Sequence, residues 1–102
     1  TMEILDEVLN NEMLGDRKRV YLSGFSLGGY GCWALAAAYP NRFAALVPIC
    51  GDGYQEWAQA TAHIPQWAFT NRLDPIVPYQ TTNAMVQLCK KSGANIRFTV
   101  YE

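Results

Sequence analysis

The chain has almost no net charge and no long apolar run. Its 102 residues carry eight Lys and Arg against nine Asp and Glu, which gives a formal net charge of −1. Nucleic acid and anionic membranes are bound by basic faces, so neither is expected as a partner. No apolar run approaches the length of a membrane span, so membrane insertion is not expected either. The remaining composition, 50% hydrophobic and 17% charged, is that of an ordinary globular domain.

Cysteine and histidine are also too few for the common metal and disulfide frameworks. The three cysteines, Cys32, Cys50 and Cys89, are odd in number and widely spaced, and His63 is the single histidine. This spacing fits neither a disulfide framework nor a zinc site, so we expect three small buried side chains and no metal. No charged-then-apolar leader is visible, and because the chain begins with Thr1 this does not decide the compartment.

Helical and strand-like segments alternate along the chain, with no repeats and no linker-like stretch. The spacing of apolar residues predicts helices over residues 2–14, 27–39, 55–61 and 79–91. Apolar and alternating runs predict strands over residues 19–25, 44–50, 66–70 and 95–101. Such alternation predicts an α/β fold, a parallel β-sheet with flanking helices. Ligands of such sheets bind beyond the C-terminal ends of the strands. One proline, Pro48, lies inside a predicted strand and suggests a local break in its ladder.

A cluster of glycines surrounds Ser26 between a predicted strand and a predicted helix. The sequence GFSLG in this context is typical of a nucleophile elbow, a turn so sharp that the serine hydroxyl is pushed outward. We expect the positions two before and two after the serine to leave no room for a Cβ, which explains Gly24 and Gly28. Gly29 and Gly31 are expected to let the following helix press against neighbouring strands.

The expected chemistry of Ser26 is nucleophilic attack. The N-terminus of the helix after it directs free N–H groups and a partial positive charge at the serine, and the N–H of Leu27 is the candidate oxyanion-hole donor. The alternative interpretation is a glycine-rich turn in which the serine only caps the helix.

With these motifs the chain resembles the α/β-hydrolase superfamily. The similarity is carried by DRKRVYLSGFSLGGYG (16–31), YPNRFAALVPICGDG (39–53), IPQWAFTNRLDPIVP (64–78) and KSGANIRFTVYE (91–102). The most similar members are serine esterases of the polyhydroxybutyrate-depolymerase-like, feruloyl-esterase-like and dienelactone-hydrolase-like groups, together with predicted peptidases. The resemblance implies a three-layer α/β/α fold and a Ser-His-Asp triad that needs no cofactor. True dienelactone hydrolases have cysteine at the elbow, whereas this chain has serine.

Asp74 is the predicted acid of the triad. In this fold the chain order is Ser, then Asp or Glu, then His, and the loop NRLDPIVP follows a predicted strand at the same sheet edge as Ser26. The resemblance places the acid in an xxDxxVP pattern that residues 72–78 match, although the usual FHGxxD sequence differs here. The alternative for Asp74 is a turn or N-cap aspartate. Asp52, the rival acid, follows another strand at this edge and is interpreted as a turn or rim residue.

His63 is not expected to be the base. It precedes the strand 66–70, whereas Ser26 follows the C-terminal end of a parallel strand, and five or six residues separate such ends by roughly 17–20 Å. The resemblance instead implies a catalytic histidine just beyond Glu102. Residues 1–102 are therefore expected to be a single partial domain, truncated at both ends and poorly stable in isolation.

The predicted function is a serine hydrolase that acts on small-molecule carboxylic esters. Ser26 would attack the carbonyl, a histidine beyond this chain would take its proton, and Asp74 would orient that histidine. A serine peptidase, an acyltransferase and a non-catalytic binding module on the same fold remain alternatives. Three aromatic residues near the C-terminal strand ends, Tyr30, Tyr54 and Trp57, are candidate substrate-binding residues together with Asp52, or ordinary packing residues.

Overall fold

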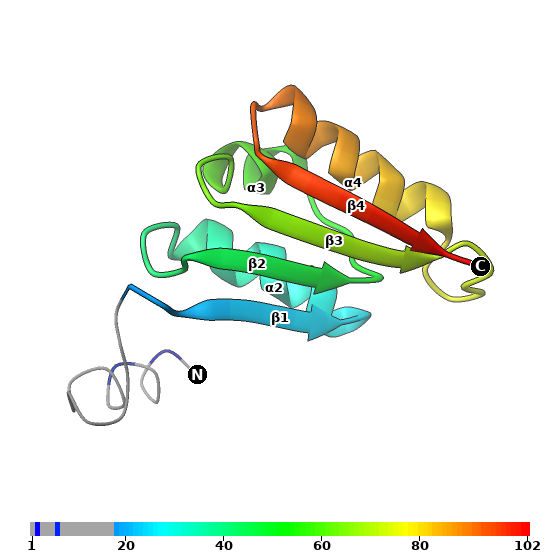
Figure 1. The fold of residues 1–102 in the computed structure, drawn as a ribbon, viewed down its shortest axis with the longest axis horizontal. Coiled ribbons are helices and arrows are strands. Elements are labelled where there is room, and N and C mark those ends of the chain that lie inside the picture. The colour runs from blue at the N-terminus through cyan, green and yellow to red at the C-terminus, as the bar shows by residue number, and fades with distance from the viewer. Residues whose placement is uncertain (1, 3–5, 7–17) are drawn as a thin grey trace.

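The computed structural model describes residues 2, 6 and 18–102, and these form a four-stranded sheet with three helices (Figure 1). In chain order the elements are β1 (Tyr21–Phe25), α2 (Leu27–Ala38), β2 (Ala45–Ile49), α3 (Gln55–Ala60), β3 (Gln66–Asn71), α4 (Tyr79–Lys91) and β4 (Ile96–Tyr101). Each lies within two residues of the bounds predicted from the sequence. The predicted helix over residues 2–14 falls almost wholly outside the described residues.

The four strands are all parallel and lie in the order β1-β2-β3-β4. Phe25, the last residue of β1, pairs with Ile49 of β2, which in turn pairs with Phe69 of β3. The segments that follow these three strands therefore leave the sheet at one common edge. The parallel α/β fold expected from the sequence is confirmed, and the candidate residues must be sought at this carboxyl edge.

Pro48 remains inside β2 and interrupts its pairing on one side only. It pairs with Gly24 of β1, but towards β3 the register joins Leu46 to Gln66 and Ile49 to Phe69, and omits the two residues between. A proline has no N–H to donate, so a gap in one ladder is its expected effect. The predicted local break is confirmed.

Helices α2 and α4 pack against one face of the sheet, behind the strands in Figure 1, and α3 lies on the same side and packs against both of these helices. The hydrophobic core lies between these helices and the sheet. Its largest fully buried apolar side chains are Trp33, Leu46, Ile64, Met85 and Val86. Burial of this layer supplies the main driving force for folding of the described residues.

A buried polar side chain, Gln66, ties three elements together inside this layer. Its Oε1 accepts a hydrogen bond of 2.9 Å from Nε1 of Trp33 in α2. Its Nε2 donates to the carbonyl oxygen of Thr61, just after α3, at 3.0 Å. Because buried polar groups are costly unless paired, this network favours one arrangement of α2, α3 and β3.

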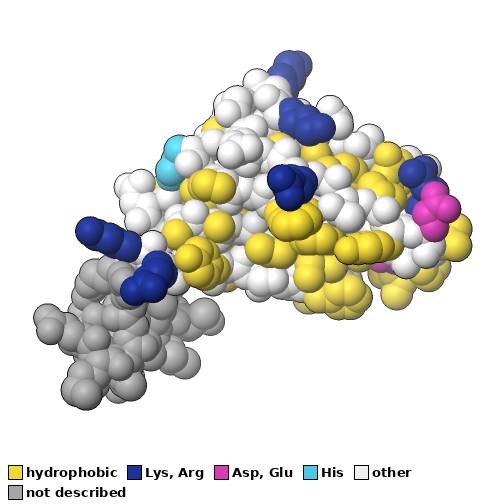
Figure 2. Space-filling model, viewed as in Figure 1, with side chains coloured by type: hydrophobic (Ala, Val, Ile, Leu, Met, Phe, Trp, Pro, Cys, Tyr) yellow, Lys and Arg dark blue, Asp and Glu magenta, His cyan; other side chains and the backbone are white. Residues whose placement is uncertain are grey.

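The opposite face of the sheet is covered by no helix among the described residues, so these show two of the three expected layers. Hydrophobic side chains spread across it in Figure 2. Trp67, Phe69 and Tyr101 stack in sequence, with ring centroids 5.0 and 6.2 Å apart. Tyr21 is 63% exposed and Phe25 is 70% exposed. An apolar face of this kind marks a surface that is normally covered.

Candidate active site

Ser26 occupies a strained turn between β1 and α2. Its backbone has φ 58° and ψ −112°, although serine strongly favours negative φ. The turn is fixed by a hydrogen bond of 2.7 Å from the Ser26 N–H to the carbonyl oxygen of Ile49. The carbonyl of Ser26 accepts from the N–H groups of Gly29 and Tyr30 at 2.9 and 3.1 Å, which begins the helix. Strain held in this way by its surroundings is typical of functional positions.

Gly24 is required by the closeness of the turn. A Cβ at Gly24 would lie 2.0 Å from the carbonyl oxygen and 2.3 Å from the carbonyl carbon of Gly28. A Cβ at Gly28, in contrast, would meet nothing within 4 Å. We expected neither glycine to have room for a Cβ, and for Gly28 this expectation is wrong. The backbone of Gly28 instead occupies the space that a Cβ on Gly24 would need.

A second close approach joins α2 to the segment after β2. A Cβ on Gly29 would lie 2.7 Å from the carbonyl oxygen of Ile49, and a Cβ on Gly51 would lie 2.7 Å from the carbonyl carbon of Gly29. Gly29 thus has the packing role predicted for it. Gly31 does not, because a Cβ there would meet nothing within 4 Å. The facing partner, Gly51, was not singled out in the sequence.

A cavity of about 500 Å³ opens beside Ser26 at the carboxyl edge of the sheet. It is lined by Ser26, Leu27, Tyr30, Cys50, Asp52, Ile76, Val77, Pro78 and Thr81. Four of the sequence-predicted residues, those at positions 26, 27, 30 and 52, thus share one cavity. The Leu27 N–H belongs to the first turn of α2, where N–H groups have no intrahelical acceptor and are directed outward.

Asp74 lies on the loop that forms the far wall of this cavity, although it is not itself in the lining. Its Oδ1 accepts hydrogen bonds from the backbone N–H groups of Ile76 and Val77, at 2.9 and 3.0 Å. These two bonds lower the pKa of the Asp74 carboxyl below its usual value. The carboxylate is therefore ionised at neutral pH, and its turn holds Ile76 and Val77 against the cavity.

Cys50 is a residue of this site that sequence reasoning did not single out. It follows β2 with a positive φ of 53°, is buried, and lines the cavity together with Ser26. Burial raises the pKa of the Cys50 thiol, and the neighbouring Asp74 carboxylate raises it further. The thiol therefore remains protonated and is a poor nucleophile. The only signal in the sequence was the glycine that follows it.

The other two cysteines behave as predicted. Cys32 and Cys89 are buried and unpaired, as is Cys50. Burial raises the pKa of both Cys32 and Cys89 to about 12. Both are small components of the core and carry no reactive thiolate near neutral pH.

The predicted aromatic residues form one cluster, of which only Tyr30 reaches the cavity. The rings of Tyr54 and Trp57 lie 4.8 Å apart, and that of Trp57 lies 4.9 Å from Tyr30, in edge-to-face arrangements. Tyr54 and Trp57 are absent from the cavity lining. Their rings therefore pack against Tyr30 and not against the cavity. Asp52 lies nearby, with its Oδ1 accepting a hydrogen bond of 2.7 Å from the N–H of Gly53.

His63 lies at the other end of the sheet. It is in the loop before β3, and its Nε2 is 2.7 Å from the carbonyl oxygen of Pro40, in the loop before β2. The strands of Figure 1 run towards the right, so the loop before β3 lies at the left-hand end of the sheet, away from the carboxyl edge. This placement agrees with the expectation that His63 is remote from Ser26.

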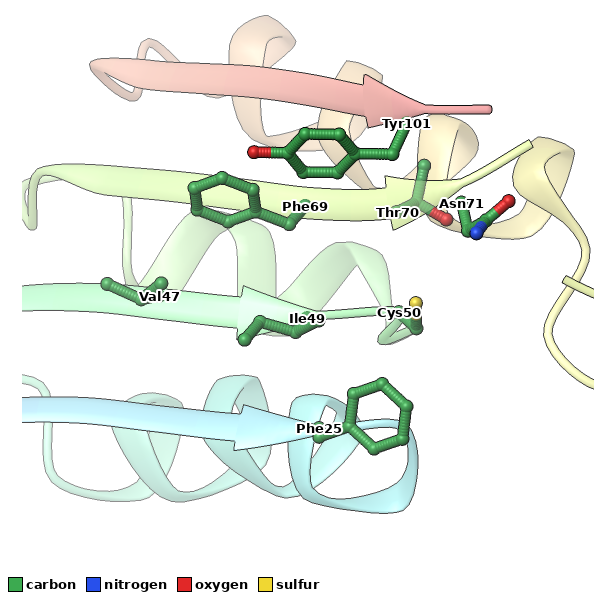
Figure 3. Close-up of a pocket in the computed structure, with 8 residues that line it drawn as sticks. All are labelled: Phe25, Val47, Ile49, Cys50, Phe69, Thr70, Asn71 and Tyr101. Carbon is green, nitrogen blue, oxygen red and sulfur yellow. The ribbon is translucent and has the colours of Figure 1, made fainter. Parts of the chain in front are cut away.

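A second cavity, of about 480 Å³, lies on the uncovered face of the sheet (Figure 3). Its wall is almost entirely apolar and consists of Phe25, Val47, Ile49, Cys50, Phe69, Thr70, Asn71 and Tyr101. Ser26 is not part of it. Of its lining residues only Cys50 also lines the cavity beside Ser26, so the two cavities meet at the residue that follows β2.

Within the described part of the chain, no three His, Cys, Asp or Glu side chains gather as a metal ion would require. Among the same residues, no helix combines the length and apolar character of a membrane span.

Comparison with known proteins finds similarity to hydrolases at the level of family, sequence and structure. The family model for the alpha/beta hydrolase fold matches residues 3–83. A bifunctional acetylxylan esterase/xylanase of Neocallimastix patriciarum is 29% identical over 85 residues, which are 83% of this chain and 12% of that protein. The crystal structure of a thermostable esterase superposes with a TM-score of 0.91 at 36% identity over 99% of this chain. An acylaminoacyl peptidase of Pyrococcus horikoshii superposes with a TM-score of 0.84 at 16% identity over 96% of this chain, a likeness of fold alone.

The chain spans only part of each of these proteins, 27% of the thermostable esterase and 21% of the peptidase. The match to the family model nevertheless covers most of the 102 residues, including the Ser26 turn and the Asp74 loop. The resemblance first read from the sequence is thereby confirmed. The chain belongs to the α/β-hydrolase fold family.

Proposed function

We propose that this chain carries the nucleophile and the acid of a serine hydrolase that cleaves carboxylic esters. The observation that supports this best is the strained Ser26 at the N-terminus of α2, beside a cavity whose far wall is the Asp74 loop. A serine that only capped the helix would bond its side chain to the first turn, and Ser26 makes no such side-chain hydrogen bond.

The proposed reaction has two halves. Oγ of Ser26 attacks the ester carbonyl carbon while a histidine takes the hydroxyl proton, and the Leu27 N–H stabilises the oxyanion of the tetrahedral intermediate. Collapse of the intermediate breaks the ester bond, and the imidazolium returns its proton to the departing alcohol. Water then attacks the acyl-serine, with the same histidine as base, and releases the carboxylic acid and free Ser26.

Asp74 is proposed as the residue that orients the histidine. Its lowered pKa keeps the carboxylate ionised at neutral pH, as is needed to stabilise an imidazolium. The two backbone N–H groups that bind Oδ1 hold the carboxyl group in one orientation. Because His63 lies at the opposite end of the sheet, we propose that the histidine comes from residues beyond Glu102.

We also propose that residues 1–102 form a single partial domain of a longer protein. The support is the apolar sheet face that no described helix covers, together with the small share of each relative that this chain spans. Ester cleavage is preferred over peptide cleavage because the two relatives of higher identity are named as esterases, whereas the peptidase resembles this chain in fold alone.

The test compares two serines, Ser23 in β1 and Ser26 directly after it, in the complete protein. Hydrolysis of 4-nitrophenyl butyrate is measured for Ser26→Ala and for Ser23→Ala. Ser23 Oγ donates to the carbonyl oxygen of Val47 at 2.9 Å and lies outside the cavity, so it controls for loss of a hydroxyl.

We expect Ser26→Ala to lower kcat by about three orders of magnitude or more, and Ser23→Ala to leave it within about twofold. Equal activity of Ser26→Ala and the parent protein would refute the proposal. A complete protein without esterase activity that still binds ester analogues would instead favour the non-catalytic binding module.

A further inference from the structure

The cavity beside Ser26 contains one charged side chain. Of the nine residues that line it, Asp52 is the sole Asp, Glu, Lys or Arg, and the rest are apolar or neutral polar side chains. Asp52 is half-buried, directly after β2. Any group that a substrate places in this part of the cavity therefore meets a negative charge surrounded by apolar walls, where charge interactions are stronger than in water.

The backbone that carries Asp52 is fixed by contacts with two helices, and its carboxylate accepts one local hydrogen bond. Its Oδ1 accepts the hydrogen bond of 2.7 Å from Gly53, and the neighbouring Gly51 is locked against α2 by the close approach to Gly29. Thr82 of α4 adds a hydrogen bond of 2.8 Å from its Oγ1 to the carbonyl oxygen of Gly51. The segment that carries Asp52 is therefore attached to two helices.

No cation within the described residues of this edge neutralises Asp52. Arg72, in the loop after β3, contacts other groups: its Nε lies 3.4 Å from Glu102, just after β4, and its guanidinium lies 4.8 Å from the ring centre of Tyr79 in α4. The other carboxylate of the edge, Asp74, adds a second negative charge. In the proposed triad the imidazolium that forms during attack pairs with Asp74 and not with Asp52.

The charge of Asp52 is felt inside the cavity. Tyr30 lines the same space, and the pKa of its hydroxyl is raised chiefly by Tyr54 and by burial, with a further contribution from the charge of Asp52. A negative charge on a substrate bound beside Asp52 would likewise be repelled by its carboxylate.

We propose that Asp52 determines the charge class of the substrate: the site accepts esters that are uncharged or cationic near the scissile bond and rejects those that carry a carboxylate there. This inference rests on the proposed esterase function. Its physical basis is that an anionic group would lose part of its hydration beside a like charge. Both effects lower the affinity for an anionic substrate relative to a neutral one. It gives Asp52, which the sequence offered as a candidate substrate-binding residue, as a rival acid and as a turn or rim residue, the specific role of selecting substrates by charge.

The test uses two matched pairs of esters in the complete protein. The first pair, 4-nitrophenyl 4-methylpentanoate and mono-4-nitrophenyl succinate, differs in charge on the acyl side. The second, 4-carbamoylphenyl and 4-carboxyphenyl butyrate, differs in charge on the alcohol side. The preference is the ratio of kcat/KM for the neutral to the anionic member of each pair. It is measured for the parent, for Asp52→Asn and for the control Glu56→Gln, which removes an exposed carboxylate of α3 outside the cavity.

We expect the parent to prefer the neutral member of at least one pair, and Asp52→Asn to reduce that preference about tenfold. Glu56→Gln should leave it unchanged, and added salt should reduce it less than the substitution does, because a half-buried charge is screened poorly. A preference that is the same in Asp52→Asn and the parent for both pairs, or that changes equally in Glu56→Gln, would overturn the proposal.

A binding measurement separates failure of this inference from failure of the esterase proposal. The 4-nitroanilides of 4-methylpentanoic and succinic acid are titrated calorimetrically into Ser26→Ala, with and without Asp52→Asn. If no ester is cleaved but the neutral anilide binds more tightly and Asp52→Asn removes the difference, the inference stands without the proposed reaction. Equal affinities, or no binding of the neutral anilide at millimolar concentration, would overturn it.

Discussion

Replacement of Gly24 by alanine should disrupt the Ser26 turn more than any other single methyl group added to this segment. The new Cβ would lie 2.0 Å from the carbonyl oxygen, 2.3 Å from the carbonyl carbon and 2.9 Å from the Cα of Gly28. An ordinary non-bonded contact between carbon atoms is about 3.5 Å, so the backbone of β1 or of α2 would have to move by more than 1 Å. Either movement shifts Ser26, which lies between them.

The expected cost follows from which atoms are in the way. An extra methyl group in a packed core typically costs about 1–3 kcal/mol when side chains can adjust. Here the obstructing atoms are backbone atoms of the first turn of α2, so we expect the upper end, about 3 kcal/mol or more. That is a large share of the ~5–15 kcal/mol that stabilises a typical domain.

Gly28→Ala provides the matched control, because the same methyl group there meets nothing within 4 Å. Gly28 lies in the first turn of α2, where alanine is favoured over glycine by up to about 1 kcal/mol. Urea unfolding of the complete protein should therefore show a clear loss of unfolding free energy for Gly24→Ala and none for Gly28→Ala. Equal stability of the two variants would refute the geometry described for the turn.

Three further predictions concern ionisation and the buried network. Because hydrogen bonds from Val77 and Ile76 hold the folded pKa of Asp74 below its ordinary value of 3.8, its carboxylate adds stability that is present above about pH 4 and is lost as the pH falls through the lowered value. Urea unfolding measured against pH should show this loss in the parent and not in Asp74→Asn. Burial raises the pKa values of Cys32 and Cys89 from 9.0 to about 12, so the stability that their protonated thiols add is present below about pH 9 and is lost between about pH 9 and 12. The double variant Cys32→Ala, Cys89→Ala should show a smaller decline of the unfolding free energy over this range. Gln66→Leu leaves the indole N–H of Trp33 without its acceptor and should lower the unfolding free energy by about 1–3 kcal/mol.

The secondary structure was predictable because local signals agreed with the fold. Helix α4 (residues 79–91) has the same bounds in the structure as in the prediction from the sequence. The apolar runs that predicted the strands are the ones that pair in register. The common edge for Ser26 and Asp74 followed from the parallel arrangement alone. Such arguments succeed because periodicity and connection order depend on the backbone and not on details of packing.

The contacts between segments remote in sequence could not be predicted in the same way. Gly24 and Gly28 look equivalent in the motif, but the turn brings the Cα of one against the carbonyl of the other, so only Gly24 must lack a Cβ. Gly29 and Gly51 are 22 positions apart, and their contact depends on how α2 packs on the end of β2. Cys50, which precedes Gly51, has a positive φ that the sequence did not predict.

The aromatic candidates illustrate the same limit of sequence patterns. Tyr30, Tyr54 and Trp57 were grouped only by their nearness to C-terminal strand ends. In the fold they form one edge-to-face cluster, in which Tyr54 and Trp57 contact each other and only Tyr30 borders the cavity. Which aromatic side chain meets a ligand is decided by rotamers and neighbours that sequence spacing does not specify.

The most direct test of the nucleophile is covalent labelling of the complete protein with a neutral fluorophosphonate, followed by peptide mass spectrometry. Attack by an activated serine displaces fluoride and leaves a phosphonyl group on Oγ. We predict a single adduct on the peptide that contains Ser26, abolished in Ser26→Ala, retained in Ser23→Ala and slowed by competing ester. An adduct confined to another residue, or a Ser26 that stays unlabelled while the protein hydrolyses esters, would contradict the assignment of Ser26 as the nucleophile.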